Sequence, residues 1–187
     1  MIELEDYILS KVNLKHDQVK EVSAAFTSKT FKNDQAVIRK GQFVSKYFFV
    51  ARGGVRFVLH TPERDITAWM IFENNMFTDL QALRSGKPSE ASILTVSETT
   101  IYSIDALKME DFYKRFPEMQ LFGRLIVEEA FLRMIDSLNS FQTMDAETRY
   151  LELLKKSDVI NRIPLKQLAS YLGVTPNSLS RIRKNIS

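Results

Sequence analysis

Residues 163–186 of this 187-residue chain read IPLKQLASYLGVTPNSLSRIRKNI. Pro164 suits the start of a helix, and Gly173 stands where a helix C-terminus favours a left-handed residue. Thr175 can then cap a second helix that has Pro176 at its first position. The residues expected to pack between the two helices are Leu168, Ala169, Leu172, Val174, Leu179 and Ile182. This spacing predicts a helix-turn-helix, and the alternative is a three-helix bundle with a charged face.

The outer face of the second predicted helix is polar and basic. Its side chains are Asn177, Ser178, Ser180, Arg181, Arg183 and Lys184. Arginine is the side chain best suited to a guanine edge, asparagine can read adenine, and serine can contact either base or phosphate. Lys166 and Thr175 are placed to hold phosphate and fix the register. These residues predict double-stranded DNA as the partner of this face.

The distribution of charge supports a polyanionic partner. The whole chain has a formal net charge of +3, but residues 149–187 hold eight basic and two acidic residues, a net charge of +6. Residues 1–148 therefore carry −3. A basic C-terminal part on a mildly acidic body indicates a nucleic-acid contact, although a solvated charged surface would have the same composition.

Composition excludes several kinds of site. The chain has no Cys, which removes disulfides, thiolate zinc sites and cysteine-ligated iron–sulfur clusters. Its two histidines, His16 and His60, lie far apart in sequence, so we expect no metal site. No nucleophile–base pair or phosphate-binding loop is recognisable, and adjacent acids such as Glu128 and Glu129 do not face one another on a helix. We expect no catalytic residues, no cofactor and no enzymatic activity.

The first residues, MIELEDYILSKV, carry acids where a signal peptide needs positive charge. No uninterrupted apolar run reaches the length of a membrane span. These features predict a cytoplasmic protein without a membrane partner.

The middle of the chain has the pattern of an antiparallel β-roll. Residues 2–27 read as helical, and short apolar runs separated by turn signals follow from about Phe31 to Ile104. The predicted strands are residues 36–38, 47–51, 55–60, 66–72, 91–97 and 100–104. Strands of this length at this spacing predict a sandwich or roll, and with the flanking helices an α+β fold.

A short helix over 106–116 and a long helix opened by Pro117 should follow the strands. The long helix carries two apolar stripes about 120° apart. One consists of Leu121, Leu125, Leu132 and Ile135, and the other of Val127, Phe131, Met134, Leu138 and Phe141. One stripe can cover the roll. The spacing of the second is that of a coiled-coil seam, but the helix alone favours an intramolecular core for both stripes. The symmetry expected of a DNA target shifts the prediction to a homodimer through residues 117–142.

Taken together, these parts resemble the CRP/FNR family of bacterial transcription regulators over nearly the whole chain. IRKGQFVSKYFFVARGGVRFVL (38–59) looks like the family's opening strands, and DAETRYLELL (145–154) looks like its first DNA-domain helix. LASYLGVTPNSLSRIRK (168–184) is similar to its recognition corner, where Arg181 takes the place of the principal base-reading arginine. The resemblance implies a cyclic nucleotide-binding-like jelly roll in residues 1–116, a dimerisation helix in 117–142 and a DNA-binding domain in 143–187.

The ligand pocket departs from the pattern of members that bind cyclic AMP. These members present Gly-Glu and, about ten residues later, Arg-Ser, which hold the ribose and the phosphate. In FTDLQALRSGKPSEASI (77–93), Thr78 and Asp79 replace the first pair, and Ser89 and Glu90 replace the second. At the position of the long helix that holds the base in those members, Met134 and Ile135 cannot donate hydrogen bonds from their side chains. The resemblance therefore implies a degenerate pocket, and the alternative is that the nearby cations Arg84 and Lys87 replace the lost arginine.

The sequence thus predicts a homodimeric, sequence-specific DNA-binding transcription regulator that does not respond to cyclic AMP. RNA polymerase and an unidentified effector are the further partners that such a role implies. The alternative is a receptor module for a small ligand or a cyclic nucleotide that signals through protein contacts, favoured by the retained roll. His60, alone on its predicted strand, reads as an ordinary surface or half-buried residue rather than a haem ligand.

Overall fold

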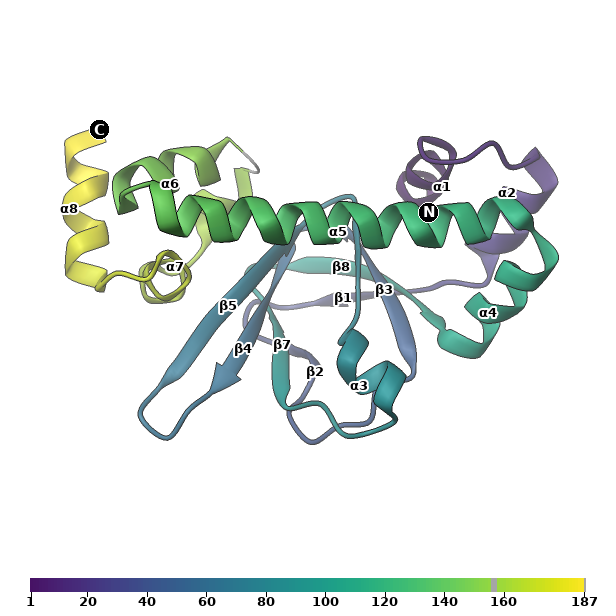
Figure 1. The fold of residues 1–187 in the computed structure, drawn as a ribbon, viewed down its shortest axis with the longest axis horizontal. Coiled ribbons are helices and arrows are strands. Elements are labelled where there is room, and N and C mark those ends of the chain that lie inside the picture. The colour runs from purple at the N-terminus through teal and green to yellow at the C-terminus, as the bar shows by residue number, and fades with distance from the viewer. Residues whose placement is uncertain (156–157, 187) are drawn as a thin grey trace.

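The computed structural model of this chain describes residues 1–155 and 158–186. It contains an antiparallel β-roll with helices on both sides of it in sequence, which confirms the expected α+β fold. A single long helix, α5 (Pro117–Thr143), crosses the top of the roll in Figure 1. Helices α1, α2 and α4 lie near its N-terminal end, and α6, α7 and α8 lie at its C-terminal end.

Two four-stranded sheets form the roll, with strand orders β1-β8-β3-β6 and β2-β7-β4-β5. The strands are β1 (Thr27–Phe31), β2 (Ala36–Ile38), β3 (Lys46–Arg52), β4 (Gly54–His60), β5 (Asp65–Phe72), β6 (Asn75–Phe77), β7 (Ala91–Thr95) and β8 (Thr99–Asp105). A buried cluster with side chains from both sheets, including Phe31, Val50, Val55, Ile93 and Ile101, lies between them. This core is what the alternation of apolar residues predicts.

Strand β1 begins at Thr27, inside the segment that was expected to be helical. Its first four residues are exposed, so they carry no apolar alternation by which the strand could be recognised. Its register is set instead by antiparallel pairing with β8, from Thr27 opposite Ser103 to Phe31 opposite Thr99. The three-residue strand β6 and the short helix α3 (Leu80–Ser85) were likewise not expected from the sequence.

Three helices pack with the N-terminal part of α5 on one side of the roll. They are α1 (Ile2–Leu9), α2 (His16–Ala24) and α4 (Ala106–Arg115). The hydroxyl of Ser10 donates to the carbonyl of Tyr7 at 2.7 Å where α1 ends, and the helical stretch continues as the separate helix α2. Large side chains such as Phe49, Phe112 and Phe122 are fully buried in the shared core.

The rotation of α5 about its axis differs from the sequence-based expectation. Its buried residues are Met119 and Phe122, whereas Leu121 and Leu132, expected to cover the roll, are 39% and 59% exposed. Gly123 permits this rotation, because a Cβ there would lie 2.9 Å from the hydroxyl oxygen of Tyr113. The missing side chain lets α5 pack directly on that phenol. The assignment of the first stripe to the roll was therefore wrong for these two leucines.

The second stripe of α5 is exposed along its length. Val127, Phe131, Met134, Leu138 and Phe141 are between 43% and 57% exposed. A contiguous apolar row on one helix is more than the scattered exposure expected of a soluble surface, and it usually marks an interface.

The C-terminal helices are α6 (Ala146–Leu154), α7 (Leu165–Leu172) and α8 (Pro176–Ile186), with the 3-10 helix η1 (Asp158–Arg162) between α6 and α7. Their buried core also includes Met70 and Phe72 of β5 and Val96. The helical unit is thus docked on its own roll through a continuous apolar cluster. The three-part division of the chain at residues 116 and 142 stays a prediction.

Candidate nucleic-acid interface

The corner between α7 and α8 is built as its sequence predicts. Leu168, Ala169 and Leu179 are fully buried, and Leu172 is nearly so. Because Ala169 has no side chain beyond Cβ, the two helices can approach closely at this point. Gly173 ends α7 in the left-handed region (φ 72°), and the Val174 amide donates to the Ala169 carbonyl at 3.0 Å.

Thr175 caps α8. Its Oγ1 accepts a hydrogen bond from the Ser178 amide at 3.1 Å, and its carbonyl accepts one from the Leu179 amide at 3.1 Å. Thr175 Oγ1 and Ser178 Oγ are also 2.9 Å apart. The capping role expected of Thr175 is confirmed, and Ser178 is half-buried against it.

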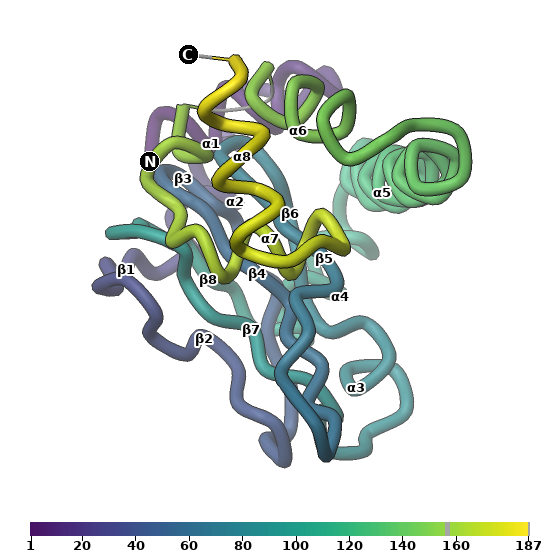
Figure 2. The backbone as a smooth tube through the Cα atoms, turned by 90° about the vertical axis from the view of Figure 1, so that its left-hand side faces the viewer, coloured from purple at the N-terminus to yellow at the C-terminus, as the bar shows by residue number. Residues whose placement is uncertain are grey.

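Four side chains of the expected DNA-binding set lie exposed on α8: Asn177, Ser180, Arg181 and Lys184. Lys166 is exposed on α7. Among residues 1–155 and 158–186, no acidic side chain forms an ion pair with Lys166, Arg181 or Lys184. Figure 2 looks along α5 and shows α8 at the end of the molecule, facing the viewer. These cations are therefore available to a partner outside the chain.

Arg183 differs from the rest of the set. It is half-buried, its Nε donates to the Tyr150 hydroxyl at 3.1 Å, and its guanidinium carbon lies 5.6 Å from the centre of that ring. The side chain is held against α6 rather than projecting with Arg181. Helical spacing alone could not show this, because Tyr150 lies 33 residues away in sequence.

Polar contacts also join α7 to the roll. The Ser170 hydroxyl accepts from the Thr67 amide of β5 at 2.9 Å. On the same side, Gln167 Nε2 donates to Asp34 Oδ1 at 3.4 Å, and Arg56 Nη2 bonds the same carboxylate at 2.9 Å. These contacts orient the helix-turn-helix relative to the roll. No sequence signal marked them, because each joins segments more than twenty residues apart.

Two of the residues expected in the degenerate pocket, Asp79 and Ser89, are hydrogen-bonded to each other. Asp79 caps α3 by accepting from the Ala82 amide at 3.0 Å, and its other oxygen accepts from the Ser89 hydroxyl at 2.6 Å. Ser89 is 2% exposed, and Glu90 beside it is exposed. The two residues at the places of the family's Glu and Arg are therefore bonded to each other. Neither offers a positive charge to a phosphate.

An apolar cavity of about 260 Å³ remains between the roll and α5. Thr78 and Met134 both line it, together with Phe57, Trp69, Ile71, Phe77 and Arg133. The Thr78 hydroxyl already donates to the Lys46 carbonyl at 2.8 Å. Asp79, Ser89, Glu90 and Ile135 do not line this cavity, so the structure gathers only two of the six expected pocket residues there.

His60 lies in a hydrogen-bonded chain on the roll. Its Nδ1 is 2.8 Å from Asp65 Oδ1, and its Nε2 is 2.8 Å from Ser92 Oγ. Ser92 is 7% exposed, and its hydroxyl also accepts from the Lys40 amide at 3.1 Å. Both ring nitrogens are engaged, and His60 joins β4, β5 and β7 as a half-buried structural residue.

Within residues 1–155 and 158–186, no group of three or more His, Asp and Glu side chains is arranged to hold a metal ion. In the same ranges, no helix combines the length and the apolar composition needed to cross a bilayer.

Comparisons with known proteins agree with the fold. Residues 28–116 match the family model of the cyclic nucleotide-binding domain. No curated protein matches the chain. Among solved structures, FixK2 from Bradyrhizobium japonicum has a TM-score of 0.73 and 14% identity, over 86% of this chain and 84% of its own.

Two further solved structures show the same arrangement. A putative transcriptional regulator of the CRP/FNR family from Eubacterium rectale has a TM-score of 0.67 and 16% identity, over 92% of this chain and 83% of its own. The catabolite activator protein of Thermus thermophilus has a TM-score of 0.55 and 18% identity, over 93% and 84% of the two chains. At these identities the likeness concerns the fold.

Proposed function

We propose that this chain, which has the fold of the CRP/FNR-type regulators and a cyclic nucleotide-binding domain in residues 28–116, binds specific double-stranded DNA as a homodimer. The single observation that carries the proposal is the exposed face of α8, where Asn177, Ser180, Arg181 and Lys184 project from a buried, capped corner. A rigid helix with free cations on its outer face is suited to the major groove.

Each of the predicted residues then has a part in the complex. Arg181 reads a base edge, with Asn177 and Ser180 beside it, while Lys184 and Lys166 contact phosphates. Thr175 and Ser178 set the start of α8 through their mutual hydrogen bond. Arg183 supports the helix from behind through Tyr150 rather than contacting DNA.

The exposed second stripe of α5 supports a dimer. Two copies packed along this stripe would cover five large apolar side chains in each subunit. The dimer would present two α8 helices to half-sites about one helical turn, ~34 Å, apart. In this proposal the protein acts in the cytoplasm, has no catalytic activity, and takes RNA polymerase and an unidentified effector as further partners.

We propose further that cyclic AMP is not the effector. In support, Asp79 and Ser89, at the places of the family's Glu and Arg, are bonded to each other, and the Met134 side chain donates no hydrogen bond to a base. Calorimetry with cyclic AMP and cyclic GMP tests this point. Binding at micromolar concentration would contradict it.

Selection of bound fragments from a random double-stranded DNA library tests the main proposal. The wild-type chain should enrich a two-fold symmetric sequence. Arg181→Ala should lose about 1–3 kcal/mol on that sequence and relax the preference at one base pair in each half-site. Lys166→Ala should instead weaken binding to all sequences about equally. Arg64→Ala, in the exposed turn between β4 and β5, is the control for loss of one positive charge.

Two results would overturn the DNA-binding proposal. One is a wild-type library that shows no enrichment. The other is an Arg181→Ala variant with unchanged affinity and unchanged sequence preference, which would contradict the base-reading role assigned to Arg181.

A second candidate function is a receptor for a small apolar ligand that signals through protein contacts. The cavity between the roll and α5 favours it, because its walls are mainly aromatic and aliphatic and it touches the helix proposed for dimerisation. Trp69, the single tryptophan of the chain, lines this cavity. A ligand screen read by tryptophan fluorescence, with the oligomeric state measured in parallel, distinguishes this function from DNA binding.

A further inference from the structure

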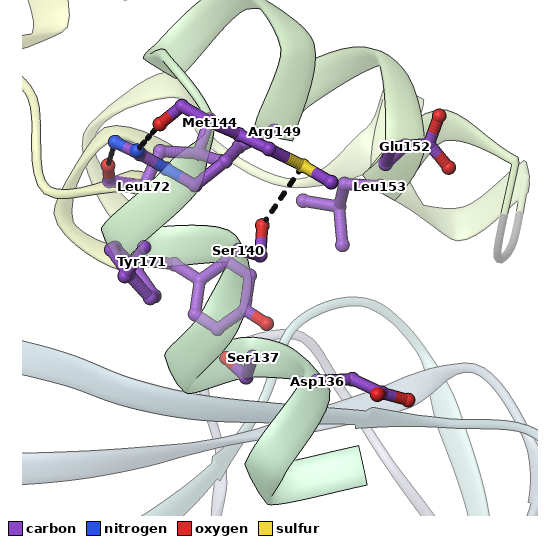
Figure 3. Close-up of a pocket in the computed structure, with 10 residues that line it drawn as sticks. Asp136, Ser137, Ser140, Met144, Arg149, Glu152, Leu153, Tyr171 and Leu172 are labelled. Carbon is purple, nitrogen blue, oxygen red and sulfur yellow. Dashed lines mark hydrogen bonds between the residues drawn. The ribbon is translucent and has the colours of Figure 1, made fainter.

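Arg149 lies where three helices meet. From α6, its Nη1 donates to the carbonyl of Met144 at 2.5 Å and its Nη2 donates to the carbonyl of Leu172 at 2.9 Å. Its guanidinium carbon is 4.8 Å from the centre of the Phe141 ring on α5. Figure 3 shows both hydrogen bonds, with the side chain directed from α6 towards the ends of α5 and α7. One side chain thus contacts all three helices.

Both carbonyls that Arg149 binds lie at C-terminal ends of helices. Met144 is the C-cap of α5, and Leu172 is the last residue of α7. The last carbonyls of a helix have no partner within the helix, and they carry its partial negative charge. A guanidinium between two such ends forms charge-assisted hydrogen bonds and offsets both partial charges. Lysine would supply the charge but not the planar fork.

These contacts connect α5 to α8 through only a few residues. Gly173 follows Leu172 directly, and Thr175, the cap of α8, comes two residues later. Only Met144 and Asp145 separate α5 from α6. A Cβ on Gly173 would lie 3.6 Å from the Phe141 ring, so the turn also touches α5 closely. The direction of α8 relative to α5 therefore depends on the position of the Leu172 carbonyl.

We infer that Arg149 is a positioning residue that sets the separation of the two α8 helices in the dimer, and hence the spacing between DNA half-sites. This inference rests on the proposed function. In the proposed complex with DNA, Arg149 itself does not contact the DNA. Successive base pairs are about 3.4 Å apart, so a displacement of α8 by a few ångström changes the preferred spacing by one base pair. Loss of the two hydrogen bonds should widen the range of spacer lengths that the dimer accepts, without altering the preferred sequence of each half-site.

The test is a selection from a DNA library in which two half-sites, taken from the wild-type enrichment, are separated by spacers of every length from zero to twelve base pairs. Wild type should select one dominant spacer. Arg149→Met keeps the length of the side chain and removes its donors, so it should select several adjacent spacers. Its affinity for the wild-type arrangement should fall about tenfold, while its affinity for a single half-site changes less than about twofold. Arg64→Met is the matched control for loss of charge and should behave as wild type.

Arg149→Lys is the second variant, in case the methionine variant does not fold. It keeps the charge at the two helix ends but cannot bind both carbonyls in one plane, so its spacer distribution should also broaden. The inference is overturned if both folded variants keep the sharp spacer of the wild type, or if single half-site affinity falls as much as dimer-site affinity. A wild type that enriches no DNA sequence overturns the proposed function and this inference together.

Discussion

The hydroxyl of Ser89 donates a 2.6 Å hydrogen bond to Asp79 at the base of helix α3. The same carboxylate caps α3 through the Ala82 amide, so one side chain both begins the helix and ties it to the segment before β7. Asp79 and Ser89 thus satisfy each other's polar groups within the chain.

Replacing Asp79 with alanine should destabilise the fold by about 1–3 kcal/mol. The change removes a helix cap and leaves the nearly buried Ser89 hydroxyl without its strong acceptor. Urea denaturation followed by circular dichroism measures the difference. Glu90→Ala, at the exposed position next to Ser89, is the matched control and should change the free energy of unfolding by less than about 0.5 kcal/mol. Equal effects of the two substitutions would contradict the structural role given to Asp79.

Phe131→Asp should convert the dimer to a monomer at micromolar concentration. Phe131 is 55% exposed in the single chain and is the second of five residues in the second stripe of α5, so a carboxylate there would be buried without a partner in the proposed dimer. Sedimentation velocity measures the change in mass. Leu107→Asp, on α4 and 82% exposed, is the control for an acidic substitution of an exposed apolar residue. A monomeric wild type, or a dimeric Phe131→Asp variant, would contradict dimerisation through this stripe.

Asp145 at the start of α6 should make stability depend on acidic pH. Hydrogen bonds from Thr148, first among them that of its backbone amide, lower the pKa of this carboxyl below 3.8. Because the folded-state pKa is lower than the unfolded one, the charged form stabilises the fold above about pH 4. This contribution is lost as the pH falls through the folded-state value. The expected result is a free-energy difference between wild type and Asp145→Asn that is present at pH 6 and shrinks towards pH 2.

Denaturation curves at several pH values measure this difference. Asparagine is also a good helix cap, so the substitution removes the charge and keeps a hydrogen-bond acceptor. A difference that does not vary between pH 6 and pH 2 would mean that the charge of Asp145 does not contribute.

The helix-turn-helix could be predicted from the sequence because its determinants are local. Gly173, Thr175 and Pro176 mark the ends of two helices, and the apolar spacing fixes which faces pack together. The structure confirms the corner and the cap. The DNA-binding role of the outward residues stays a prediction, and for Arg183 the structure gives a supporting position against Tyr150.

Features that depend on distant segments could not be predicted in the same way. The rotation of α5 brings Gly123 against Tyr113, a contact with another helix that no periodicity within α5 reveals. Strand β1 was missed because its residues are mostly exposed and its pairing partner β8 comes some seventy residues later. The two contacts of Arg149 join residues that the sequence separates by 5 and 23 positions.

The apolar cluster shared by β5 and the C-terminal helices has a consequence for protein engineering. Met70, Phe72 and Val96 of the roll belong to the same buried cluster as Leu153, Leu168 and Leu172 of the C-terminal helices. A chimaera that joins these helices to a different roll would lose these apolar contacts unless Met70, Phe72 and Val96 were transferred as well. Excised alone, the C-terminal fragment would expose this apolar surface to solvent and tend to self-associate, so the helices are best transferred as a unit that includes β5.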